Sequence, residues 1–501
     1  MRIYYAAFIF LVAEIWLVII YKSPAGSAPR KPRAAILTGK RSRKNGQFQM
    51  QQFALKQSGF AVVKVDQDKL DVEKYSKILC TNFDFSKCFS VEQYLSAVRK
   101  NIPVNRILGQ KQVLTAKDAL CDTLNLGLGP HVQAYAFQCW VLPRDLKSFQ
   151  SYVSGENNST HSLWVTKLVG NGGGVGIRFY NDTKQILERS GREKPEEFVV
   201  QPALENPFLL FGKKIDLRVY VLITSVRPAR VYICREGLVR RAGHNYTNSA
   251  TGKFSQLTNV FQSSNVYDKY DDAVLSFESL RKHLGGSLYD AAFERIKLAI
   301  VGTVVASEPR FEDIFESTSK AFFCKSCYAL LGVDVILDDA LEPHVIEMNG
   351  LPSMKLSGKG DPFALYAHGR QGSVHWADAM KIKLHIEEEL LTAPATHKHK
   401  NIRFEKNIAN RKAHDVYWED EAILRMRIEA ETITSMQYES GNTVDPIDDY
   451  LVRLRHETLP DTSWDLAYPT RRKEPFREIF KFQNRTARWK LHEYLAKHVP
   501  E

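Results

Sequence analysis

The sequence lacks the patterns that identify the commonest nucleotide-binding and nucleic-acid-binding proteins. It contains no internal repeats, no Walker A loop ending in Gly-Lys-Ser/Thr and no Rossmann glycine fingerprint. No aromatic RNA-binding motif or DNA-recognition helix stands out either, so we expect no nucleic-acid partner. Any nucleotide chemistry must therefore be argued from other groups of residues.

Cysteine is also scarce, with seven residues in a chain of 501. Because this number is odd and the cysteines are scattered, the pattern predicts no disulfide framework. Cys324 and Cys327 form a C-x-x-C pair, but no second pair and no nearby pair of histidines completes a zinc site. We therefore expect two buried thiols at these positions.

Acidic residues are outnumbered by basic ones, and the formal net charge is +12. A hydrophobic content of 44% and a charged content of 25% are typical of a globular protein. A chain of this length can hold about two to four domains. The positive charge favours acidic partners such as an acidic protein tail or an anionic lipid surface.

The N-terminal segment 4–20 is apolar apart from Glu14, and its length matches the short end of a membrane-spanning helix. Arg2 precedes it, whereas basic residues without any acid follow it over 22–44. The positive-inside rule then predicts a transmembrane anchor at 1–21 with the rest of the chain in the cytosol.

The competing interpretation of this segment is a signal peptide that is cleaved near residues 25–28. A luminal body would make N-glycosylation sequons relevant. The sequence has such sequons at Asn157/Asn158, Asn181, Asn245 and Asn484.

The chain divides into segments of different composition. We expect a disordered basic linker at 22–45, followed by an N-terminal α/β domain, a central domain, a third domain and a basic, partly helical C-terminal extension, at 46–105, 106–205, 206–390 and 391–501. Apolar runs predict strands at 60–65, 164–168, 197–201, 217–223 and 229–233, and helical periodicity covers much of 277–305 and 422–430.

Two further apolar runs, 333–337 and 344–349, flank a polar turn and predict a β-hairpin. If Leu337 faces His344, antiparallel pairing places Asp334 opposite Glu347. Side chains alternate along a strand, so Glu347 and Asn349 share a face. Two carboxylates and an amide oxygen then converge, and such hard oxygen ligands suit Mg²⁺. The alternative is a solvated edge hairpin.

Basic residues precede this hairpin in two other places. Lys214, Asp216 and Arg218 alternate at the start of a predicted strand and share one face, where the cations can hold phosphates or a carboxylate. An exposed cross-strand ion pair is the alternative. Lys167 ends another strand just before the glycine loop 170–177, and a lysine beside flexible backbone N–H groups can cradle a polyphosphate.

Together these features indicate a nucleotide site with a glycine lid, a basic strand and a metal corner. This layout resembles the ATP-grasp superfamily, and its finer motifs are similar to those of the tubulin–tyrosine ligase-like family, over about residues 106–356. The matching motifs are Trp164–Lys167, Gly174–Ile177, Val199–Gln201, Lys214–Val221, Gly237–Arg240, Leu257–Asn259, Leu331–Asp334 and Glu347–Ser353.

The resemblance implies an α/β (α+β) ATP-grasp fold of mixed and antiparallel sheets with flanking helices. It also implies ATP-dependent ligation of an amino acid onto acidic tubulin tails, through an acyl-phosphate that an amine attacks. A long basic C-terminal extension resembles the members that elongate glutamate chains, so a polyglutamylase that uses glutamate is expected.

The resemblance also implies roles for individual residues. ATP would be bound by Lys167, the lid glycines Gly174 and Gly176, the hinge residues Gln201 and Leu204, and Lys214, Asp216, Thr258 and Asn259. Arg218 and Arg240 would hold the acyl-phosphate or the incoming carboxylate, and Asp334, Glu347 and Asn349 would bind Mg²⁺.

The sequence departs from the family pattern on the nucleotide side. Pro202 and Ala203 replace a basic residue and an aromatic after the hinge glutamine, and Pro202 lacks an N–H donor. Gly173 and Val175 replace basic lid residues, and Gln256 replaces a histidine. These departures keep open the alternative of a membrane-anchored pseudoenzyme that binds microtubules. The signal-peptide interpretation and the sequons keep open a luminal, glycosylated ATP-grasp ligase.

Overall fold

The computed structural model describes residues 31–37, 51–352, 464–470, 474–497 and 499, with gaps at 53, 57, 83–84, 156–160, 194, 260–272 and 320–323. The predicted anchor at 4–20 and the predicted helix at 422–430 lie outside these residues and stay predictions. Within the described part of the chain, no helix is long and apolar enough to cross a membrane.

The first of three β-sheets is formed by the N-terminal residues. Strands β1 (Arg33–Leu37), β2 (Ala61–Val65) and β3 (Lys77–Cys80) are parallel, in the order β2-β1-β3. The prediction of a disordered linker at 22–45 is therefore wrong for β1, which is the central strand. Its residues 34–37 are almost fully buried, because a short apolar run between two partner strands outweighs the basic sequence around it.

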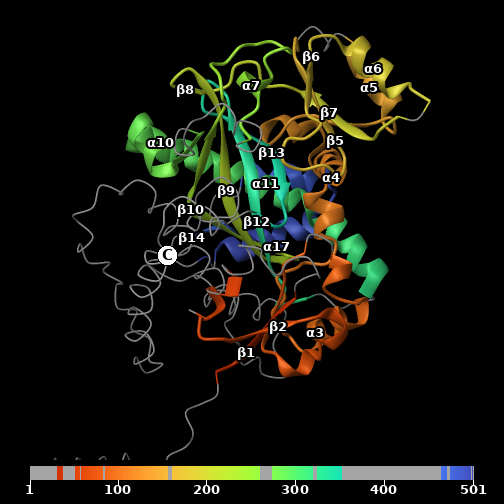
Figure 1. Cartoon of the computed structure of the whole chain (residues 1–501), viewed down its shortest axis with the longest axis vertical. Coiled ribbons are helices and arrows are strands. Elements are labelled where there is room, and N and C mark those ends of the chain that lie inside the picture. Colours follow the sequence, from red (N-terminus) through yellow and green to blue (C-terminus); the bar gives the residue numbers. More distant parts are fainter. Residues whose placement is uncertain are drawn as a thin grey trace, which may run out of the picture.

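The second sheet holds the strand that carries Lys167. Strands β4 (Trp140–Leu142), β5 (Trp164–Leu168), β6 (Arg178–Tyr180) and β7 (Phe198–Pro202) are antiparallel, in the order β4-β7-β5-β6. Helices α5 (Leu146–Ser154) and α6 (Thr183–Ser190) accompany this sheet, at the upper right of Figure 1. The strands predicted at 164–168 and 197–201 are confirmed within one residue.

The third and largest sheet is antiparallel and lies between the other two (Figure 1). Its main path runs β11-β10-β9-β12-β13, and two further strands pair with β9 and β10. The strands are β8 (Leu209–Leu210), β9 (Lys213–Val226), β10 (Ala229–Arg241), β11 (Val274–Ser276), β12 (Ala329–Leu337), β13 (Pro343–Asn349) and β14 (Trp464–Tyr468).

Two helices that contact each other also contact this sheet and border the site. Helix α4 (Lys117–Leu128) packs against the long helix α11 (Gly286–Ser319). The approach is close at Gly127, where a Cβ atom would lie 2.2 Å from the carbonyl oxygen of Ala306. The remaining helical elements are α3 (Val91–Arg99), α7 (Lys253–Gln256), α10 (Phe277–Leu284), η1 (Gln67–Lys69), η2 (Val72–Lys74), η3 (Phe85–Lys87), η4 (Lys111–Thr115) and η5 (Gly129–Ala134).

The C-terminal residues belong to the folded body. Strand β14 pairs with β10, and helices α16 (Glu474–Phe482) and α17 (Thr486–Ala496) follow it. Buried Glu308 of α11 faces Arg485, Arg488 and His492, each with a nitrogen 3.6 Å from a Glu308 oxygen. The segment predicted as an extension therefore supplies helices, as expected, but also a strand of the largest sheet.

Six of the seven cysteines form disulfides, which corrects the expectation of unpaired thiols. The pairs are Cys80–Cys88, Cys121–Cys139 and Cys324–Cys327, with Cα atoms 5.3–5.8 Å apart. Cys234 on β10 is buried and forms no disulfide. The sequence could not reveal these pairs, because a disulfide depends on proximity of Cα atoms in space rather than on regular spacing along the chain.

Candidate active site

Four neighbouring strands of the largest sheet place charged side chains in a row. Arg240 on β10 pairs with Asp216 on β9. Arg218, two residues along β9 and on the same face, pairs with Asp334 on β12. Asp334 in turn lies opposite Glu347 on β13. The register of the sheet thus creates the charged row.

The two arginines of this row share one carboxylate. Arg218 approaches Asp334 with Nε at 2.6 Å from Oδ1 and Nη2 at 3.1 Å from Oδ2. Arg240 places Nη2 2.9 Å from the same Oδ2, while its Nε donates to Asp216. All four side chains are largely buried, so these ion pairs are weakly screened by solvent.

The pKa values of Asp334 and Asp216 shift in opposite directions from the ordinary value of an aspartate. Burial alone would raise the pKa of Asp334, but the charges of Arg218 and Arg240 outweigh it and lower the pKa to about 2. Burial raises the pKa of Asp216, and the negative charge of Asp334 adds to this rise while Arg240 opposes it. Asp334 is therefore the firmly ionised member of the pair.

Lys214 extends the same face of β9 and contacts the loop that follows β10. Its Nζ donates to Oε1 of Gln256 at 2.9 Å and lies 5.7 Å from the centre of the Tyr246 ring. Thr258 donates its hydroxyl hydrogen to Asp216. Burial lowers the pKa of Lys214 to about 8, against the opposing effect of Asp216. Gln256, one of the departures from the family pattern, is thus a direct partner of a predicted nucleotide ligand.

The hairpin is formed as predicted, with one difference in register. Asp334 lies opposite Glu347, as expected, but Leu337 lies opposite Pro343 rather than His344. A β-bulge between Asp334 and Val335 absorbs the extra residue. Bulges commonly change the direction of side chains near active sites. Because of this bulge, Asp334 lies opposite Glu347 although the register at the turn differs from the prediction by one residue.

The residues Asp334, Glu347 and Asn349 fit a magnesium ion by their donor chemistry. Nδ2 of Asn349 lies 3.4 Å from Oδ2 of Asp334, which leaves the amide oxygen for a metal. Oδ2 of Asp334 already faces three donors, whereas Oδ1 accepts from Arg218 Nε, so the second lone pair of Oδ1 is the position that would bind a cation. Across the described residues, no group of three or more His, Cys, Asp or Glu side chains could hold a metal, and the mixed set of two carboxylates and an amide stays a prediction.

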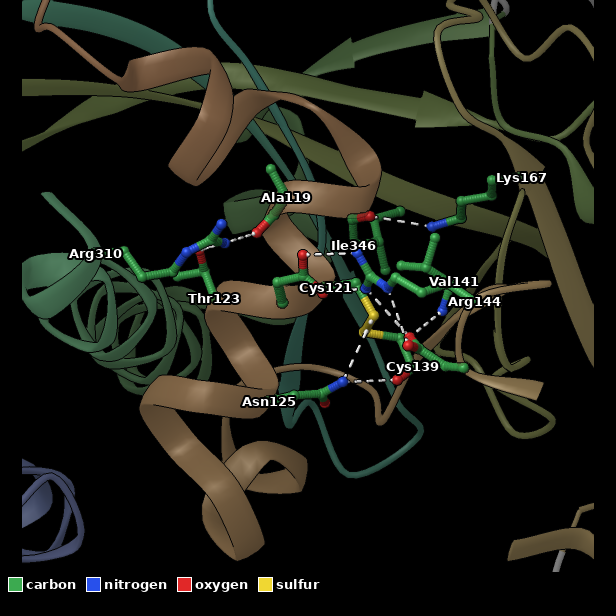
Figure 2. Close-up of a disulfide and its surroundings, with 12 residues drawn as sticks. Ala119, Cys121, Thr123, Asn125, Cys139, Val141, Arg144, Lys167, Arg310 and Ile346 are labelled. Carbon is green, nitrogen blue, oxygen red and sulfur yellow. Dashed lines mark hydrogen bonds and ion pairs between the residues drawn. A yellow bond between two sulfur atoms is a disulfide. The ribbon is translucent and has the colours of Figure 1, made fainter. Parts of the chain in front are cut away.

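A pocket beside the charged row contains Lys167. Its walls come from η4, α4, the segment before β4, β5, β7 and β13, and include Lys117, Cys121, Cys139, Lys167, Gln201 and Glu347. Lys167 donates from Nζ to the carbonyl oxygen of Ile346 at 3.0 Å (Figure 2). Burial lowers the pKa of Lys167 to about 8; Glu347 opposes this effect and Lys117 adds to it.

The glycine loop lies between β5 and β6 and requires glycine at defined positions. Gly174 and Gly176 have φ values of +75° and +77°. A Cβ atom on Gly176 would also lie 2.4 Å from the Leu168 side chain. Backbone of this kind exposes N–H groups at a turn, as phosphate-binding loops do.

The roles predicted for the hinge residues stay predictions, and the structure shows where these residues lie. Gln201 lines the pocket, whereas Leu204, Asn259 and the two lid glycines are not among its lining residues. Pro202 closes β7 opposite Trp164, and the Ala203 N–H donates to the carbonyl oxygen of Leu163. The N–H group of Ala203, the first backbone donor after Pro202, is therefore already engaged in a hydrogen bond within the protein.

Sequence reasoning missed Lys117, the first residue of α4. Its Nζ lies 3.6 Å from Oε1 of Glu347 and donates to the carbonyl oxygen of Asn171 in the glycine loop. Lys117 thus links the metal corner to the lid. A lysine in a first helical turn opposes the helix dipole, and this conflict is the signal that could have found it.

Comparison with known proteins supports the resemblance to the tubulin–tyrosine ligase family that the sequence motifs indicate. Residues 97–364 match the model of the tubulin–tyrosine ligase family. Similar proteins include mouse "tubulin monoglutamylase TTLL4", 30% identical over 274 residues, 52% of this chain and 22% of that protein. Zebrafish "tubulin polyglutamylase ttll6" is 28% identical over 271 residues, 52% of this chain and 34% of that protein.

A third relative, "tubulin polyglutamylase TTLL7" of Xenopus tropicalis, is 24% identical over 298 residues, 56% of this chain and 32% of that protein. The chain thus spans about a fifth to a third of the length of these relatives. The family model, in contrast, covers more than half of the chain and includes every residue of the charged row. The chain therefore belongs to the tubulin–tyrosine ligase family.

Proposed function

We propose that the protein is an ATP-dependent carboxylate–amine ligase that adds glutamate to the side chains of an acidic protein tail. The observation that carries this proposal is the row Arg240–Asp216–Arg218–Asp334–Glu347, largely buried except at Glu347, beside the lysines Lys167 and Lys214. The names of the relatives point to the tubulin tail as the acceptor. The net charge of +12 favours an acidic acceptor of this kind.

The chemistry follows from the weakness of a carboxylate as an electrophile. In the first step an acceptor carboxylate oxygen attacks the γ-phosphorus of ATP, and ADP leaves with the electron pair of the broken P–O bond. In the second step the neutral α-amine of glutamate attacks the acyl carbon, phosphate leaves and the nitrogen loses a proton. The products are an isopeptide, ADP and phosphate, so atoms and charge balance.

The side chains of the site suit the charges that these steps create. Lys167 and Lys214 are buried cations at neutral pH and would hold the nucleotide phosphates. Arg218 and Arg240 would bind the transferring phosphoryl group or the glutamate carboxylate, because planar guanidinium groups match such oxyanions. Asp216 and Asp334 fix the direction of both guanidinium groups in advance, which lowers the cost of reorganisation.

Asp334, Glu347 and Asn349 are the residues that would hold Mg²⁺. When bound there, the ion would neutralise phosphate charge and so favour phosphoryl transfer. Lys117 forms an ion pair with Glu347, and Lys167 donates to the carbonyl oxygen of Ile346. These two contacts connect the predicted metal site to the wall of the pocket.

Two observations favour a second candidate, a microtubule-binding pseudoenzyme. Arg218 and Arg240 already satisfy Asp334, and the Ala203 N–H is used by the sheet rather than offered to a base. Calorimetry with Mg-ATP separates the two candidates. Binding that requires Mg²⁺ and is lost in Glu347→Gln supports the ligase, whereas no binding to the wild-type chain supports the pseudoenzyme.

The direct test is transfer of labelled glutamate. The purified chain is incubated with Mg-ATP, labelled glutamate and either tubulin or tubulin whose tails have been removed. We expect label in intact tubulin only, together with release of ADP. The control Glu342→Gln makes the same change on the same hairpin, at an exposed side chain that pairs with Arg295, and it should keep the activity. No label with a working ligase in parallel would refute the proposal for tubulin.

A further inference from the structure

We infer that the folded body of this protein matures in an oxidising compartment of the secretory pathway, with Asn181, Asn245 and Asn484 as N-glycan acceptors. This inference makes the protein a luminal glycoprotein rather than a cytosolic one. It rests on two independent observations, the pairing of the cysteines and the exposure of the sequons, and it does not depend on the proposed ligase activity.

The first observation is that cysteine pairing is almost complete. Three disulfides use six of the seven cysteines. Thiols of cytosolic proteins are kept reduced, and stable disulfides are characteristic of secreted and luminal proteins. Cys324–Cys327 carries least weight, because C-x-x-C pairs also occur as catalytic redox sites. The other two disulfides are the stronger indication of an oxidising compartment.

Those two pairs tie separate structural elements together in the protein interior. Cys80 ends β3 and bonds to Cys88, which lies between η3 and α3, and both are fully buried. Cys121 of α4 bonds to Cys139, directly before β4 (Figure 2). Cys121 and Cys139 pack with Val141 and Val199, so this disulfide is part of the core between the helix and the four-stranded sheet. Buried bonds that join elements indicate a structural role.

The second observation is that every sequon asparagine in the described residues is exposed. Asn181 lies between β6 and α6, Asn245 lies in the loop after β10, and Asn484 lies in the turn between α16 and α17. A glycan is bulky and polar, so it requires an exposed loop position of this type. Threonine occupies the third position in all three sequons, at residues 183, 247 and 486.

The inference also narrows the acceptor of the proposed ligase, and this step rests on the proposed function. An enzyme in a luminal compartment meets acidic segments of proteins that share that compartment. Tubulin tails then serve as a test acceptor whose chemistry matches. A luminal location with no glutamate transfer would refute only the ligase. A chain that is isolated from eukaryotic cells fully reduced and unglycosylated, and that transfers glutamate, would refute only the luminal assignment.

The test uses the full chain expressed in eukaryotic cells, which are lysed in denaturant with an excess of alkylating reagent so that the buried Cys234 can react. Mass spectrometry should find one alkylated cysteine, Cys234, before reduction and the other six only after reduction. The wild-type chain should migrate faster after digestion with peptide N-glycosidase F. Asn181→Gln, Asn245→Gln and Asn484→Gln should each remove one step of the mobility shift.

A matched control accompanies the asparagine variants. Thr247→Ser keeps the sequon of Asn245, together with the hydroxyl that hydrogen-bonds to Ser255, so it should keep the glycan step. Thr247→Ala should lose that step without any change to the asparagine. Alkylation of all seven cysteines without reduction, or a wild-type chain that the glycosidase does not shift, would overturn the inference.

Discussion

Arg218 binds Asp334 through two nitrogens, at 2.6 Å and 3.1 Å, across neighbouring strands at the centre of the largest sheet. The carboxylate of Asp334 also forms an ion pair with Arg240, so one carboxylate aligns two guanidinium groups. The arrangement holds two positive charges in place before any phosphate arrives. A substitution of Asp334 should therefore release both Arg218 and Arg240 at once.

Asp334→Asn should lower ATP turnover on the order of 100-fold, because it removes a metal oxygen and releases two arginines. It should also destabilise the fold by about 3–5 kcal/mol, since both arginines would be left partly unpaired in the interior. Steady-state kinetics and chemical denaturation measure the two effects. Asp339→Asn, an exposed change in the same hairpin turn, should leave both unchanged. Equal behaviour of the two variants would contradict the account.

The affinity for ATP should fall as pH rises through about 8, because Lys167 and Lys214 lose their protons there. Stability should respond in the opposite direction. The folded pKa values are lower than the ordinary 10.5, so the unfolded chain binds more protons between about 8 and 10.5, and these lysines make folding more favourable as pH rises.

Binding titrations at several pH values check this prediction, with thermal unfolding in parallel. Lys167→Arg stays protonated over the whole range and should reduce the fall in affinity, because only Lys214 then titrates. An affinity that does not change between pH 7 and pH 9.5 would show that neither lysine contacts phosphate as a cation.

Replacement of both Cys121 and Cys139 by alanine should cost about 3 kcal/mol of unfolding free energy, by the loop-closure argument for a loop of 18 residues. It should also weaken ATP binding, because both residues line the pocket. The matched control is the Cys80/Cys88 double alanine variant, whose disulfide does not line the pocket. That variant should lose stability while ATP affinity stays normal. Similar ATP affinities for the two variants would refute the link to the pocket.

Glu308→Gln should loosen the attachment of α17, because it removes the buried charge that faces Arg485, Arg488 and His492. A loss of about 3–5 kcal/mol is expected for one partner of a buried ionic cluster. Hydrogen exchange should show faster exchange across 486–496 than in the wild-type chain. Glu278→Gln, which breaks an exposed pair with Lys282, serves as the control and should have no effect.

The parts of the site that could be predicted from the sequence each lie within one strand or one hairpin. Alternation along β9 places Lys214, Asp216 and Arg218 on one face, and a short hairpin sets Asp334 opposite Glu347. The predicted register near the turn was wrong by one residue, because a bulge depends on backbone packing that the alternation of apolar and polar residues does not encode.

The features that were missed depend on contacts between distant segments. Lys117 reaches Glu347 only because α4 lies beside β13. The three disulfides follow from proximity in the fold, and β1 was hidden because basic residues surround a short apolar run. Patterns within one segment cannot report such contacts, whereas the motifs of the charged row are each complete within a strand.

If the charged row supports ATP-dependent transfer of glutamate, each glutamate that is incorporated requires the conversion of one ATP to ADP and phosphate. The most direct measurement is the ratio of ADP released to labelled glutamate incorporated into an acidic-tail acceptor, for the wild-type chain, Glu347→Gln and Glu342→Gln. The account predicts a ratio near one for the wild-type chain and Glu342→Gln, with no incorporation by Glu347→Gln. Equal incorporation by all three chains, or ADP release by the wild-type chain without incorporation into any acidic tail, would contradict it.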